Sequence, residues 1–230
     1  MELNRPLATI TPTLDGDVLA LLAQHEVSFT TGQLHRVLTR YSEEGIRKVL
    51  MRLTRQGIVR SERVGNAFSY QLNRDHLAAV PIIELAQLLS TLLSKLEKRF
   101  KSWGEYQPEY AAVFGSAARG TMTADSDLDI LLVRADDTPL AAWEEQVHAL
   151  AADVTRWTGN DTRLLEYTVS GLNVARSEPV LRDVLTEGLT VAGSHDWLNR
   201  QLRTEPLTWG APGPAPRRSA EAACSSPADS

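Results

Sequence analysis

The sequence is poor in cysteine and in long apolar runs, and both absences narrow the class of protein. Cys224 is the only cysteine in 230 residues, so no disulfide can form within the chain and we expect a reducing compartment. No apolar run reaches the roughly 18 residues of a membrane-spanning helix, and residues 1–10 lack the basic start and apolar stretch of a signal peptide. We therefore expect a cytoplasmic protein with no membrane partner.

Three common patterns of catalytic or metal-binding residues are also missing. The five histidines show no metal-ligand spacing, which predicts structural or solvent-exposed roles for them. Ser116 lies outside a Gly-x-Ser-x-Gly elbow and no histidine is placed to serve it, which argues against an acyl-enzyme mechanism. Gly120 is followed by Thr121 where a P-loop requires lysine, so the segment is not a P-loop.

The formal net charge of −5 hides an uneven distribution. Residues 1–80 carry ten basic and eight acidic side chains, and the segment 36–63 within them carries eight basic and three acidic ones. A local basic excess of this kind attracts a polyanion such as nucleic acid.

The first eighty residues show the spacing of three short helices and a hairpin. Apolar residues recur at helical intervals over 14–25, a capping box opens a second helix over 30–38, and a serine caps a third helix that stops before Gly57. Two strands then flank the turn Gly65-Asn66. Three helices plus a β-hairpin describe a winged-helix domain, which we assign to residues 1–80.

The third helix and the hairpin are predicted to contact DNA. The basic side of the helix would enter a major groove, and the hairpin would contact the phosphate backbone. The order of elements and the charge resemble the winged-helix domains of bacterial regulators of the MarR and ArsR kind, which implies binding to double-stranded DNA. The candidate DNA-binding residues are Arg36, Arg40, Arg47, Lys48, Arg52, Arg55, Arg60 and Arg63. A solvated charged face, or a winged helix used for protein contacts, is the alternative.

A long helix is predicted over residues 81–104, opened by Pro81. Its leucines form a continuous apolar stripe from Leu85 to Phe100. We expect this stripe to be buried against the winged helix or against a second copy of the chain. The second arrangement gives a homodimer, whose twofold symmetry suits a palindromic DNA site.

Residues 105–194 alternate between apolar strand runs and helical spacing, which predicts a small α/β (α+β) domain with a mixed sheet and flanking helices. The predicted strands are 110–114, 128–133, 162–168 and 189–192. Residues 195–230 are predicted to form a short helix and then, from Glu205 onward, a disordered tail rich in Pro, Ala, Ser and Gly.

The strongest functional signal is a glycine–serine turn followed by two aspartates. An apolar strand ends at Phe114 and Gly115-Ser116 turns the chain, so free backbone N–H groups there are expected to face an anion. Asp127 and Asp129 follow on a second strand, where residues two apart share a face and lie about 6 to 7 Å apart. Two carboxylates at that spacing suit divalent cations.

This pattern resembles the nucleotidyltransferase superfamily that includes DNA polymerase beta, most closely its minimal bacterial branch, over roughly residues 110–193. The resemblance implies that the Gly-Ser turn holds a nucleoside triphosphate and that Asp127 and Asp129 are catalytic ligands of two Mg²⁺ ions. It also implies a third carboxylate on a later strand, which helps to activate the acceptor hydroxyl. The candidate nucleotide-binding residues are Gly115, Ser116, Arg119 and Ser126.

The third carboxylate is predicted from strand alternation over residues 162–168. Alternation favours Glu166, and Asp161 at the strand entrance is the second candidate. Related proteins more often have aspartate at this place. If neither residue reaches a metal ion, the domain binds nucleotide without turning it over.

Together these inferences predict an enzyme that transfers NMP from an NTP to a hydroxyl group of a protein or a small molecule. Minimal members of the family resemble antitoxins that nucleotidylate a partner, so a toxin-like protein is a candidate acceptor. The alternative is a DNA-binding transcriptional regulator whose nucleotidyltransferase-like domain only senses nucleotide or binds a partner. An antibiotic-modifying transferase is disfavoured, because the domain is small and has no obvious sugar-binding extension.

Overall fold

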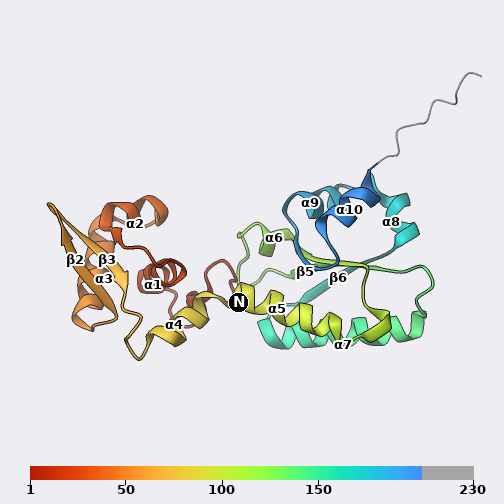
Figure 1. The fold of residues 1–230 in the computed structure, drawn as a ribbon, viewed down its shortest axis with the longest axis horizontal. Coiled ribbons are helices and arrows are strands. Elements are labelled where there is room, and N and C mark those ends of the chain that lie inside the picture. Colours follow the sequence, from red (N-terminus) through yellow and green to blue (C-terminus); the bar gives the residue numbers. More distant parts are fainter. Residues whose placement is uncertain (204–230) are drawn as a thin grey trace, which may run out of the picture.

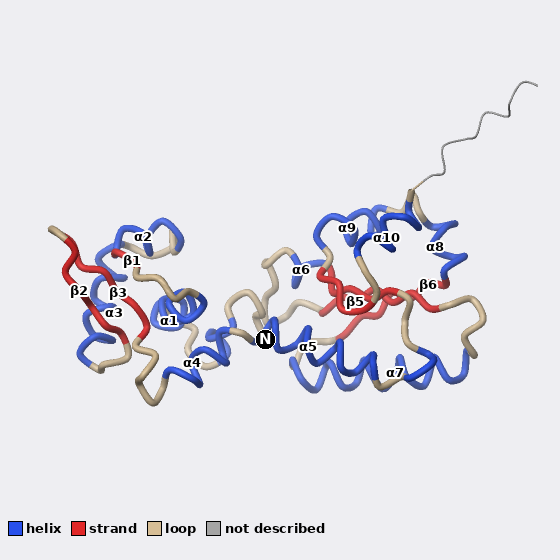
Figure 2. The backbone as a smooth tube through the Cα atoms, in the orientation of Figure 1, coloured by secondary structure: helices blue, strands red, loops and turns tan. Residues whose placement is uncertain are grey.

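The computed structural model describes residues 1–203, which form an N-terminal helical part and a C-terminal α/β part (Figure 1). The predicted tail from Glu205 onward lies outside the described residues. The N-terminal part has one hydrophobic core, and the C-terminal part has one core on each face of its sheet. Figure 2 shows that the strands lie in two separate groups, one in each part.

The N-terminal part contains helices and a hairpin in the predicted order. Its elements are η1 (Pro6–Thr9), α1 (Leu14–Gln24), β1 (Phe29–Thr30), α2 (Thr31–Val37), α3 (Glu43–Arg55), β2 (Val59–Val64) and β3 (Ala67–Leu72). Thr30 and Gln33 form the predicted capping box, and Ser42 caps α3 by accepting a hydrogen bond from the backbone N–H of Gly45. The three strands are antiparallel in the order β1-β3-β2, so the hairpin is joined by one short strand.

The predicted single helix over 81–104 is wrong. Two helices, α4 (Ala79–Ala86) and α5 (Leu88–Lys101), are separated at Gln87 and bent by 66°. The bend follows from packing, because Ile82 on α4 is buried in the N-terminal core whereas Leu96 on α5 is buried in the C-terminal core. The apolar stripe is therefore divided between the two cores of one chain.

The C-terminal part is built on a mixed four-stranded sheet in the order β6-β5-β4-β7. Its strands are β4 (Tyr110–Phe114), β5 (Leu128–Arg134), β6 (Thr162–Thr168) and β7 (Leu189–Ala192). Its remaining elements are η2 (Gly104–Tyr106), α6 (Gly115–Ala118), α7 (Leu140–Thr158), α8 (Val169–Ala175), α9 (Pro179–Glu187) and α10 (His195–Leu202). The β5–β6 pair is parallel, and β4 pairs antiparallel with β5 and β7.

Helices cover both faces of this sheet, and the alternation of β5 decides which residue faces which side. Helices α5 and α7 lie on one face, and α8, α9 and α10 lie on the other (Figure 1). Ile130 and Leu132 belong to the core that contains Trp143 of α7, whereas Leu131 and Val133 belong to the core that contains helices α8 to α10. Odd-numbered residues of β5 therefore face α8 to α10.

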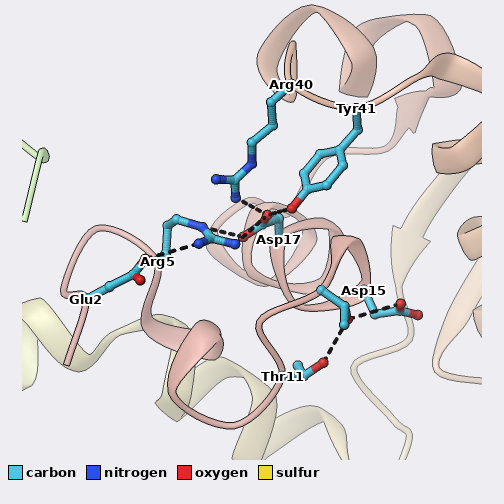
Figure 3. A network of polar contacts seen from close by, with 8 residues as sticks. Glu2, Arg5, Thr11, Asp15, Asp17, Arg40 and Tyr41 are labelled. Atoms are coloured by element: carbon cyan, nitrogen blue, oxygen red, sulfur yellow. Dashed lines mark hydrogen bonds and ion pairs between the residues drawn. The ribbon is translucent and has the colours of Figure 1, made fainter. Parts of the chain in front are cut away.

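The N-terminal segment contacts both parts of the chain. Leu3 is buried in the C-terminal core and Leu7 in the N-terminal core. Between them, Arg5 donates hydrogen bonds to Asp17 of α1, whose carboxylate also accepts from Arg40 and from the Tyr41 hydroxyl (Figure 3). This charged network attaches the segment to the helical part.

Within the described residues, no single helix has both the length and the apolar character needed to cross a membrane. Among the described helices, only α4 and α5 taken together, as a bent pair, are long and apolar enough by length and composition.

Candidate functional site

The glycine–serine turn and the aspartate pair meet at one end of the sheet. Phe114, the last residue of β4, is the register partner of Asp129 on β5. Gly115 follows with φ of 69°, a left-handed conformation that favours glycine. A Cβ atom at Gly115 would collide with Oδ2 of Asp129. The missing side chain therefore lets the turn lie against the carboxylate, although the two are fourteen positions apart in the sequence.

Asp129 on β5 faces the side of the sheet covered by α8 to α10, and Asp127 immediately precedes β5 and contacts Arg163 of β6. Burial raises the pKa of the Asp129 carboxyl. The negative charge of Asp127 raises this pKa further, while Arg163 and Arg119 oppose the shift. Two carboxylates this close repel each other, so the pair favours a positive partner.

That partner in the free protein is Arg163, which the sequence analysis did not select. Arg163 on β6 is the register partner of Asp129, and its guanidinium nitrogen lies 2.8 Å from Oδ2 of Asp127. The alternation of side chains along β6 already indicates in the sequence that Arg163 and Glu166 lie on opposite faces of the strand. What the sequence did not reveal is which of the two faces carries the aspartates.

The structure does not bring Glu166 to the aspartates. Glu166 is the register partner of Leu132, so it lies on the α7 face of the sheet, opposite to Asp129. Its Oε2 accepts a hydrogen bond of 2.6 Å from the indole N–H of Trp143. Glu166 thus accepts the hydrogen bond of the indole N–H of a buried tryptophan. The prediction that Glu166 faces the aspartate pair is wrong, because the strand register turns it to the opposite side of the sheet.

Asp161 is exposed at the start of β6, and its backbone carbonyl accepts a hydrogen bond of 2.8 Å from the Leu128 N–H. This contact ties the entrance of β6 to the start of β5. Among the described residues, no group of three or more His, Cys, Asp or Glu side chains is placed to hold a metal ion.

The remaining predicted nucleotide-binding residues surround the turn. Ser116 is partly exposed in α6, and Arg119 follows at the end of that short helix. Arg119 donates a hydrogen bond of 2.7 Å to Oε1 of Glu187 on α9, and this bond raises the pKa of the guanidinium. The Ser126 hydroxyl accepts a hydrogen bond of 3.0 Å from the Thr123 N–H, so it organises the loop before Asp127.

Asn160 is a second residue of this region that was not predicted from the sequence. It is 2% exposed, and its side-chain amide donates hydrogen bonds of 3.1 Å to the Ala124 carbonyl and 2.9 Å to the Ser126 carbonyl. These bonds fix the loop that delivers Asp127. A turn position gives no sequence signal of such burial.

The donor set at this site fits a magnesium ion that arrives with a nucleotide. Mg²⁺ is usually held by one or two carboxylates and completes its octahedral shell with water and substrate phosphates. Asp127 and Asp129 supply such a pair of carboxylates. They do not by themselves form a cage for two ions, and one oxygen of Asp127 already contacts Arg163.

The eight predicted DNA-binding residues are not equally available. Five of them contact a carboxylate within the N-terminal part, in the pairs Arg40–Asp17, Arg47–Glu44, Lys48–Glu44, Arg52–Asp15 and Arg60–Asp75. The Arg63 Nε donates to the Gly65 carbonyl. Arg36 and Arg55 have no carboxylate partner among residues 1–203.

The Gly-Ser turn, the two aspartates and most of the sheet lie in the part of the chain that a family model matches. Residues 93–172 match the family model described as "Nucleotidyltransferase domain". This match begins in α5 and ends in α8, so it includes the turn, both aspartates and Arg163. A comparison with curated proteins finds no match.

Solved structures with a similar part are toxin–antitoxin proteins. The crystal structure of a toxin–antitoxin with AMP-PNP shares 22% identity over 48% of this chain and 80% of its own, with a TM-score of 0.36. A mutant of the toxin–antitoxin MntA-HpeT shares 21% identity over 48% of this chain and 80% of its own, also with a TM-score of 0.36. A second MntA-HpeT mutant shares 22% identity over 47% and 78%, with a TM-score of 0.34.

Proposed function

We propose that the C-terminal part is a Mg²⁺-dependent nucleotidyltransferase that moves NMP from an NTP to a hydroxyl group. The observation that carries the proposal is the packing of Gly115 against the carboxylate of Asp129, with Asp127 two residues earlier, immediately before β5. This packing brings a candidate phosphate-binding turn and a candidate metal-binding pair to one place, as a bound metal–triphosphate requires. The match of residues 93–172 to the nucleotidyltransferase model supports the same conclusion.

In this proposal each residue has a limited task. Asp127 and Asp129 hold the magnesium ion, whose chemistry is to neutralise phosphate charge during transfer. The turn at Gly115 and Ser116 contacts the phosphates through backbone N–H groups and the hydroxyl. The acceptor oxygen forms a bond to the α phosphorus as the bond to pyrophosphate breaks. Asn160 maintains the geometry by fixing the loop before Asp127.

We propose a protein hydroxyl as the acceptor, in line with the resemblance to minimal nucleotidyltransferases that modify a toxin-like partner. A small-molecule hydroxyl is the other acceptor of the same chemistry. Transfer of label from NTP to a protein band or to a small-molecule fraction distinguishes the two.

We further propose that the N-terminal part is a winged helix that binds double-stranded DNA. Its three helices and hairpin have the required order, and α3 presents basic side chains beside the hairpin. An open groove of about 430 Å³ between them is lined in part by Arg47, Arg55 and Phe68. Since most of the basic residues already contact carboxylates, we expect moderate affinity that depends strongly on salt.

A second candidate function is a regulator that binds nucleotide without transferring it. Two observations favour it: residues 1–203 place no third carboxylate with the aspartate pair, and Arg163 contacts Asp127. The two candidates make the same prediction for nucleotide binding and opposite predictions for transfer.

The deciding experiment incubates the full chain with α-labelled NTP, Mg²⁺ and cell lysate. We expect label in one acceptor, and at least a hundredfold less label with the Asp127→Ala and Asp129→Ala variants, on the order of the loss seen when a charge-stabilising group is removed. Asp137→Ala is the matched control, because Asp137 is an exposed carboxylate beyond the far end of β5. Nucleotide binding with no transfer in any fraction would favour the regulator.

A further inference from the structure

Arg163 competes for the carboxylate that the proposed metal ion needs. It is the register partner of Asp129 on the neighbouring strand, and its guanidinium contacts Oδ2 of Asp127 at 2.8 Å. A metal ion bound through that oxygen draws on the same lone pairs, so the two cations cannot both keep their full contact with Asp127. A metal ion that binds through Oδ2 of Asp127 therefore displaces Arg163 from that oxygen.

The ion pair is easily exchanged. The side chain of Arg163 is 73% exposed and that of Asp127 is 28% exposed. An ion pair in such an exposed setting contributes little, because solvent screens the attraction and a long side chain loses freedom. A divalent cation together with a triphosphate offers a much larger electrostatic gain. Arg163 is thus a movable group rather than a fixed part of the sheet.

We propose that Arg163 exchanges partners when nucleotide binds. In the free protein it neutralises Asp127, and in the complex it releases Asp127 to the metal ion and binds the triphosphate. The planar guanidinium suits this second task, since its parallel N–H groups match the oxygens of a phosphate. The inference rests on the proposed function and adds a phosphate-binding residue to the site.

The exchange predicts two effects of opposite sign, which a purely structural ion pair between β5 and β6 does not produce. Removing the guanidinium frees Asp127, so the metal ion alone should bind more tightly. The same change removes a phosphate ligand, so nucleotide at saturating metal should bind more weakly. If Arg163 only paired with Asp127 and contacted no phosphate, its removal would change both affinities in the same direction or leave both unchanged.

The test measures binding to the full chain carrying Arg163→Gln. Free Mn²⁺ is followed by electron paramagnetic resonance without nucleotide, and we expect binding about two- to fivefold tighter than wild type. Calorimetry at saturating Mg²⁺ then uses non-hydrolysable analogues of the four ribonucleoside triphosphates, and we expect binding about tenfold weaker for the analogue that wild type prefers. Arg163→Lys should restore part of the nucleotide affinity.

Arg156→Gln is the matched control. Arg156 on α7 is 72% exposed and contacts Asp153 at 2.6 Å, so it loses a comparable ion pair away from the site. It should change neither affinity. Effects of the same sign, or no effect, for Arg163→Gln would overturn the exchange alone. Wild-type protein that binds no nucleotide would overturn the proposed function and the exchange with it.

Discussion

At the scale of single residues, the site depends on a glycine that no other residue can replace without cost. Gly115 combines a left-handed backbone with direct packing against Asp129. These are two separate requirements, one conformational and one steric, and a suitable control separates them.

Gly115→Ala is expected to abolish measurable nucleotide binding and to lower the free energy of unfolding by about 1 to 2 kcal/mol, the cost of a side chain in the left-handed region. Gly159→Ala provides the control, because Gly159 has a similar φ of 71° but no atom within 4 Å of an added Cβ. Urea denaturation should show a loss for both variants that is at least as large for Gly115→Ala, whose added Cβ also meets Asp129, and calorimetry should show lost binding for Gly115→Ala only. Equal nucleotide affinity in the two variants would contradict the steric part of the argument.

Asp17 illustrates a residue whose charge state stabilises the fold. Burial, the largest single influence, raises the pKa of its carboxyl, but the hydrogen bonds from Arg5, Tyr41 and Arg40 together outweigh burial and hold the pKa below its usual value. A lowered pKa in the folded protein means that the stabilisation is present above the ordinary aspartate value of about 4 and disappears as the pH falls through the folded value.

Asp17→Asn is therefore expected to lower the free energy of unfolding by about 2 kcal/mol at pH 7, because two guanidinium groups and a hydroxyl lose a charged acceptor. The loss should begin to shrink as the pH falls below about 4, and it should vanish once the pH lies below the lowered pKa of the folded wild-type carboxyl. Denaturant titrations at pH 7 and pH 3 measure this difference. A loss of the same size at both pH values would show that the charge of Asp17 is not its cause.

At the scale of secondary-structure elements, the sequence predicted most of the helices and strands because their signals are local. The capping residues of α2 and α3, the Gly65-Asn66 turn and the strands around the aspartates all lie within a few residues of the elements they define. The bend at Gln87 was missed, since an apolar stripe of helical period does not state which core each turn will contact.

For the candidate site too, the residues of the local motif could be predicted from the sequence and those that depend on strand pairing could not. The Gly-Ser turn and Asp127 with Asp129 form a local motif, whereas the choice between Arg163 and Glu166 depends on how β6 pairs with β5. A shift of one residue in that pairing would exchange the two faces. Burial of Asn160 also arises only from tertiary packing.

The test of DNA binding concerns two elements, because Arg36 lies on α2 and Arg55 lies on α3. Arg36→Ala with Arg55→Ala should weaken binding to the promoter of the protein's own gene and reduce the slope of log affinity against log salt by about 2, since each lost phosphate contact lowers the slope by about 1. A gel-shift salt series measures the slope. Arg156→Ala with Arg200→Ala, two arginines of the C-terminal part, should leave it unchanged; an unchanged slope for the first pair would contradict the assignment.

At the scale of the whole molecule, one chain segment and one bent helix pair connect the two parts. Leu3 is buried in the C-terminal core and Leu7 in the N-terminal core. The apolar stripe is divided in the same way, because α4 packs in the N-terminal core and α5 packs in the C-terminal core. The parts shown in Figure 1 are therefore linked twice. Of the six residues from Leu85 to Phe100 that form the stripe, all except Leu88 pack within one or other core.

The divided stripe has a consequence for how much DNA one molecule can cover. A palindrome is read by two copies related by a twofold axis, and the apolar stripe was the seam predicted to join them. Here the leucines that would form that seam are already occupied inside each monomer. Footprinting should accordingly reveal protection of a single half-site, shorter than one helical turn of about 10 base pairs.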